Sequence, residues 1–137
     1  MNRRVSVWAT AVSLGIAGAL IGGCGADDDA HPAHSAYDAR TQKAVKRAVR
    51  EAVNKALAGP GTRVVSHAIA CRPESDVLLA CTDEVEFDET ESAGAPTPTM
   101  TDRFKYQARI RPEARRFQLE TTQGNGSTET LGSFRVP

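Results

Sequence analysis

The sequence predicts an α+β fold, in which one long N-terminal amphipathic helix packs on a four-stranded antiparallel sheet. Three observations support this prediction. Small apolar residues recur with helical spacing between residues 35 and 61. Four later segments alternate apolar and polar residues, a period typical of strands with one buried face. Two cysteines, Cys71 and Cys81, fall on neighbouring predicted strands.

The first 23 residues have the layout of an export signal. A basic head with Arg3 and Arg4 is followed by an uncharged apolar stretch over residues 5–21, and two glycines precede Cys24. Residues 21–24, IGGC, resemble the lipobox of bacterial lipoproteins, which is an aliphatic residue and two small residues before a cysteine. The resemblance covers residues 1–24 only.

The lipobox resemblance implies that Cys24 carries a diacylglyceryl group and that the leader, residues 1–23, is cut off just before it. Two or more acyl chains hold a protein stably on a bilayer, so we expect an anchor on the outer face of the cytoplasmic membrane. Two alternatives stay open. Residues 5–23 are just long enough to span a bilayer as an uncleaved helix, and the leader could be a plain secretory signal that leaves Cys24 free.

Residues 24–37 are predicted to form a flexible acidic tether between the anchor and a single domain over residues 38–137. The tether holds side chains that could in principle coordinate a metal ion. Metal sites need ligands in fixed positions, and a spacer of this composition does not provide them. We therefore interpret as solvated the following residues: Asp27, Asp28, Asp29, His31 and His34.

The helix is predicted within residues 35–61. Ser35 followed by Asp38 resembles a capping box, and Gly59 with Pro60 is a stop signal. The apolar stripe consists of Val45, Ala48, Val49, Ala52, Val53, Ala56 and Leu57. The opposite side, here called the basic face, consists of Arg40, Lys43, Lys46, Arg47, Arg50 and Lys55.

The basic face has two interpretations. Near an anionic membrane each Lys or Arg adds about 1 kcal/mol of attraction, so the face is a candidate surface for anionic headgroups or another acidic partner. The apolar stripe, however, has no Trp or Phe that could insert into a bilayer. This favours a helix that packs on the sheet and keeps its basic face in solvent.

Strands are predicted over residues 62–71, 76–88, 102–111 and 115–122, and the final stretch, residues 130–137, could add a fifth. Residues 72–75 are predicted to form the first turn. The core side of the second strand is expected to hold Val77, Leu79, Cys81, Val85 and Phe87, and that of the third Phe104, Tyr106, Ala108 and Ile110.

Charges on the polar sides predict how the second and third strands pair. An antiparallel register with Glu86 opposite Lys105 also places Asp88 opposite Arg103. The same register would put two apolar pairs side by side, Phe87 with Phe104 and Val85 with Tyr106.

Cys71 and Cys81 are predicted to form a disulfide. Facing residues on adjacent strands lie at the separation that a disulfide requires, and an exported protein meets oxidising conditions. Neither cysteine belongs to a CxxC motif that would indicate redox or metal chemistry.

Charge and motifs restrict the function. The chain has 17 basic and 17 acidic side chains; loss of Arg3 and Arg4 with the leader leaves 15 against 17, a net charge of about −2. That balance gives no reason to expect a nucleic-acid partner. No catalytic signature is present, and His67, the one histidine outside the tether, falls on a predicted strand.

We therefore expect a membrane-anchored, non-enzymatic binding module of the bacterial envelope that needs no cofactor. Its partners would be membrane lipid through acylated Cys24 and an envelope protein, peptidoglycan or anionic headgroups. A small-ligand carrier with a pocket between helix and sheet is the alternative, and an envelope enzyme is less favoured. The acidic run over residues 83–91 lacks the spacing of a calcium loop, and nothing in loop 89–101 specifies a ligand.

Overall fold

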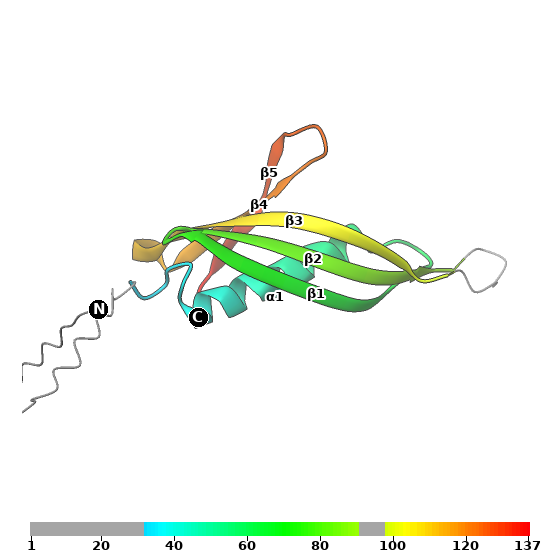
Figure 1. Cartoon of the computed structure of the whole chain (residues 1–137), viewed down its shortest axis with the longest axis horizontal. Coiled ribbons are helices and arrows are strands. Elements are labelled where there is room, and N and C mark those ends of the chain that lie inside the picture. Colours follow the sequence, from blue (N-terminus) through cyan, green and yellow to red (C-terminus); the bar gives the residue numbers. More distant parts are fainter. Residues whose placement is uncertain (1–31, 91–97) are drawn as a thin grey trace, which may run out of the picture.

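The computed structural model describes residues 32–90 and 98–137. One helix, α1 (Ala39–Ala56), lies against one face of a curved five-stranded antiparallel sheet (Figure 1). The strands follow the chain in the order β1-β2-β3-β4-β5: β1 (Thr62–Ser75), β2 (Leu78–Glu89), β3 (Met100–Arg111), β4 (Arg116–Thr122) and β5 (Thr128–Arg135). The α+β class is confirmed, and the fifth strand is present.

The leader and Cys24 lie outside the described residues. Within residues 32–90 and 98–137, no helix combines the length and the apolar character needed to cross a membrane.

The N-terminus of α1 is capped by Asp38. Its carboxylate accepts hydrogen bonds of 2.9 Å from both the backbone N–H and the hydroxyl of Thr41, which satisfies one of the donors that a helix start leaves free. The predicted cap at Ser35 is wrong, because Ser35 is fully buried one turn earlier and accepts instead from the Tyr37 N–H.

The core lies between α1 and the inner face of the sheet. Val45, Val49 and Val53 project from the helix and are fully buried against residues such as Leu79 and Leu119. Each such side chain contributes about 1.5–3 kcal/mol through burial. The segment before the helix belongs to the same packing: Ala36 is fully buried, and its N–H donates to the Asp76 carbonyl at 2.7 Å.

The first turn lies later than predicted. β1 continues through residues 72–75, and the chain reverses at Asp76 and Val77, which leaves Val77 42% exposed rather than in the core. Pro73 does not end the strand because β1 is an edge strand, where the missing N–H breaks no ladder bond.

The predicted register between β2 and β3 is wrong by four residues. Arg103 lies opposite Glu84 instead of Asp88, and the two side chains form an ion pair of 2.7 Å. The observed register aligns the buried residues of the two strands, Cys81 with Tyr106 and Leu79 with Ala108. Burial of these side chains outweighs exposed charge pairs, which are worth roughly 0.2–1 kcal/mol each.

The disulfide between Cys71 and Cys81 is confirmed, with an S–S distance of 2.03 Å. The two cysteines lie directly opposite each other on β1 and β2. Cys81 is buried in the core, so the bond joins an edge strand to the centre of the fold.

Candidate functional site

The basic face covers the outer side of α1. The helix carries six basic side chains and only one acidic side chain, Glu51. Among the residues that the structure describes, no ion pair involves any of the six. The positive end of the helix dipole lies at the same end as Arg40 and Lys43 and is capped by the Asp38 carboxylate, so the positive potential of this face comes from its basic side chains.

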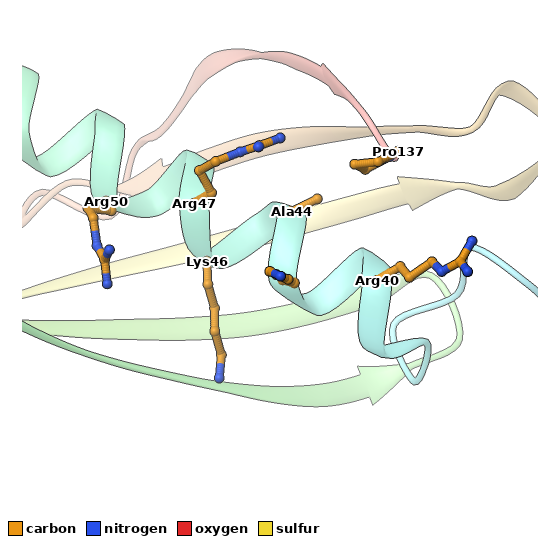
Figure 2. Close-up of a pocket in the computed structure, with 7 residues that line it drawn as sticks. Arg40, Ala44, Lys46, Arg47, Arg50 and Pro137 are labelled. Atoms are coloured by element: carbon orange, nitrogen blue, oxygen red, sulfur yellow. The ribbon is translucent and has the colours of Figure 1, made fainter.

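Five of the six predicted basic residues line one open hollow: Arg40, Lys43, Lys46, Arg47 and Arg50. Figure 2 shows that the labelled cations point in different directions. Lys46 and Arg50 extend to one side of the helix, whereas Arg47 extends along the side where Pro137 lies. Lys55 is separate and lines a different hollow nearer the end of α1.

A groove continues from the basic face between α1 and β5. One section, about 310 Å³, lies between Ala48 on the helix and Phe134 on β5. A second section of about 500 Å³ shares Ala48, Glu51 and Phe134 with it and extends to Ala52 and Leu131. These volumes are in the range of small-molecule sites. The groove is open and lies on the β5 side of α1.

A buried polar cluster joins β1, β2 and α1. The Nδ1 atom of His67 lies 2.7 Å from a carboxylate oxygen of Asp83, and Nε2 lies 3.0 Å from the side-chain oxygen of Asn54. The His67 side chain is 9% exposed and the Asp83 side chain is fully buried. Both ring nitrogens thus face side chains from neighbouring elements, so the imidazole ring links β1 to β2 and to α1.

Sequence reasoning missed Asp83. Strand alternation puts Asp83 on the same face as Cys81 and Val85, and this pattern could have predicted its burial. Its charge instead groups it with the acidic run of residues 83–91. Its second oxygen, Oδ1, is buried and has no hydrogen-bond partner among the described residues. A buried carboxylate is costly without a partner, so the contact with His67 is needed for Asp83 to lie there.

Tyr106 on β3 lies in the same region of the core. Burial raises the pKa of its hydroxyl to about 12, and the negative charge of Asp83 contributes further. The residue is thus a neutral phenol over the whole physiological range.

A histidine–carboxylate pair can serve in general acid–base catalysis, but the group must reach a substrate. The hollow at the basic face and the two sections of the groove have neither His67 nor Asp83 in their walls. The cluster therefore connects three elements of the fold. Across the same residues, no three His, Cys, Asp or Glu side chains gather in a way that could hold a metal ion.

The chain matches no family model, no curated protein and no solved structure. The function must therefore be argued from the residues themselves.

Proposed function

We propose that this protein is an exported lipoprotein of the bacterial envelope, anchored through Cys24, and that it is a non-enzymatic module that binds an anionic partner with the basic face of α1. In this proposal α1 is the N-terminal amphipathic helix of the mature domain. The observation that supports it is the set of five cations along the outer surface of α1, none of them in an ion pair within the described part of the chain.

Few residues of sequence separate the proposed anchor from the basic face. Thirteen residues, 25–37, separate Cys24 from the helix cap at Asp38. Even fully extended they reach at most about 50 Å, which keeps the basic face close to the bilayer. Anionic headgroups there attract a cluster of Lys and Arg by about 1 kcal/mol per charge, and salt screens this attraction.

The anchor is tested by expression of the full chain in bacteria supplied with an alkyne-labelled fatty acid. We expect label on the wild-type chain and membrane fractionation that only detergent reverses. Cys24→Ser should lose the label, whereas the double variant Cys71→Ser/Cys81→Ser, which keeps Cys24, should retain it. An unlabelled wild-type chain, or recovery without detergent, would overturn the anchor.

The binding surface is tested by the four lysines of the chain, Lys43, Lys46, Lys55 and Lys105. The anchored protein is placed in nanodiscs of phosphatidylcholine, with or without phosphatidylglycerol, and treated with an amine-reactive reagent. We expect the acidic lipid to protect Lys43 and Lys46 but not Lys105, which is exposed on β3. Equal modification of all lysines in both nanodiscs, with no protection by added peptidoglycan or envelope extract, would contradict the proposal.

A further inference from the structure

The groove between α1 and β5 has a basic end and a longer section with mainly apolar walls, and Glu51 lines both. Arg47 and Arg135 line the end nearest the basic face, and neither forms an ion pair among residues 32–90 and 98–137. Farther along, the walls are mainly the small side chains of Ala48, Ala52 and Ala56 on the helix and the apolar side chains of Leu131 and Phe134 on β5. The charged side chains that also line this section are Glu51, Lys55 and Glu129.

The groove suits a slender apolar ligand. Alanine side chains leave a shallow, smooth helix wall, and on the opposite wall Phe134 stacks on Phe117 with ring centroids 5.3 Å apart. Leu131 is 39% exposed, so a hydrocarbon chain in the groove would remove apolar surface from water.

An added peptide strand fits this edge of the sheet less well. β5 carries a bulge at Leu131, where the pairing with β4 skips a residue, and a bulge interrupts the regular ladder that strand addition requires. A hydrocarbon chain needs no backbone hydrogen bonds, so the bulge is no obstacle to it.

We infer that the groove binds one acidic lipid molecule, with the anionic head at Arg47 and Arg135 and an acyl chain along the alanines of α1, Phe134 and Leu131. The inference rests on the proposed function, because the anchor would keep the groove beside a bilayer that supplies such lipids. It goes further in that it predicts a single lipid with its chain in the groove, not only headgroups attracted to the surface.

The test uses a single tryptophan as a reporter. Trp8 is the only tryptophan in the chain and lies in the leader that the proposed cleavage removes, so a new tryptophan reports alone in the anchored protein. Leu131→Trp places it in the groove wall. Val65→Trp is the matched control, because Val65 is also an exposed bulge residue on an edge strand and lines none of the hollows described here. The full chain is anchored in phosphatidylcholine nanodiscs and titrated with a monomeric phosphatidylglycerol whose acyl chain is brominated.

We expect saturable quenching of the fluorescence of Leu131→Trp but not of Val65→Trp, and much weaker quenching by the brominated choline lipid. Arg47→Gln and Arg135→Gln should each weaken the affinity about fivefold, whereas Lys46→Gln and Arg50→Gln, which alter cations on the other side of α1 (Figure 2), should change it less. Ala52→Phe, which fills the groove and removes no charge, should abolish quenching and leave the lysine protection intact.

Three results would overturn the inference. Equal quenching of the two tryptophan variants would indicate adsorption to the bilayer alone. Equal affinity for acidic and choline lipids would remove the role of the arginines. Protection of Lys43 and Lys46 without quenching of Leu131→Trp would exclude the lipid in the groove and leave the proposed function standing. Protection of these lysines by an acidic peptide only would have the same meaning. Failure of the anchor or of lysine protection would instead contradict the proposed function.

Discussion

Asp83 carries a carboxylate that is fully buried in the core. It lies on the buried face of β2 and is held by His67 from β1, which in turn contacts Asn54 on α1. Transfer of a charge into the interior is unfavourable unless the charge is paired and hydrogen-bonded. The contacts join three elements at one place, so the cluster specifies how α1 and β1 are positioned over β2.

Removal of His67 should therefore be strongly destabilising. His67→Ala leaves the Asp83 carboxylate buried with neither oxygen paired, and we expect the free energy of unfolding in urea to fall by about 3 kcal/mol or more. Asn54→Ala removes an exposed partner and should cost about 1 kcal/mol. The double variant His67→Leu/Asp83→Leu should lose less than His67→Ala alone, because no buried charge is left. If Asn54→Ala were as costly as His67→Ala, the buried carboxylate would not be the source of the loss.

Tyr106 provides a second test of the same region. Its pKa is raised to about 12, above the value of about 10 for an unfolded tyrosine. The unfolded chain thus releases the proton first as the pH rises, so this contribution to stability is complete below about pH 10 and is lost toward pH 12. On a Tyr37→Phe background, absorbance at 295 nm should give a midpoint near 12 for the native protein and near 10 in urea. A native midpoint near 10 would show that the hydroxyl is not buried.

At the level of elements, the sequence predicted which segments form the helix and sheet but not how they pair. The apolar period of two places Leu79 and Tyr106 correctly on buried faces, because it depends on the strand itself. The register depends on which residues of two neighbouring strands lie opposite each other. Complementary charges such as Glu86 and Lys105 decide it only weakly. The turn at Asp76 was missed because Pro73 breaks a central strand but is tolerated at an edge.

The N-cap of α1 can be tested by pH. Burial acts to raise the pKa of Asp38, but hydrogen bonds from Thr41 and from the Arg40 N–H outweigh it, and the pKa is lowered. The Asp38 carboxylate therefore contributes to stability above its pKa in the unfolded chain, which is about 3.9. This contribution is lost as the pH falls through the lower pKa of the folded state. Asp38→Ala should cost about 1 kcal/mol at pH 7.

Asp38→Asn is the matched control, because asparagine also caps helices but does not titrate. We expect it to be nearly as stable as wild type at pH 7 and to lose less stability between pH 5 and pH 2. Chemical unfolding across this range measures both effects. An identical pH profile for the wild type and Asp38→Asn would show that the carboxylate charge has no part in the cap.

The disulfide stabilises the pairing of β1 with β2. It closes a loop of ten residues, for which chain entropy gives about 2.5–3 kcal/mol. Cys71→Ala/Cys81→Ala should lower the free energy of unfolding by about this amount, and reduction of the wild type should lower it similarly. A variant as stable as the oxidised wild type would show that the core alone holds β1 in place.

At the scale of the whole molecule, stability and the proposed binding surfaces are separated. The buried residues are concentrated in α1, β2 and β3, whereas the tip of the β4–β5 hairpin stands away from the rest of the fold (Figure 1). Residues 122–131 at this tip are all exposed. The far wall of the groove is therefore built on the part of the fold with the least burial.

This distribution predicts the order of amide hydrogen exchange. Regions with few buried contacts open locally at low free-energy cost, whereas core strands exchange only on global unfolding. In the full chain we expect the amides of residues 123–130 to exchange first and those of the central strands β2 and β3 last. Reduction of the disulfide should speed exchange in β1 and leave the hairpin tip unchanged. If residues 128–130 were as slow as β2, the hairpin would be part of the rigid core, and the open groove between α1 and β5 would have fixed walls.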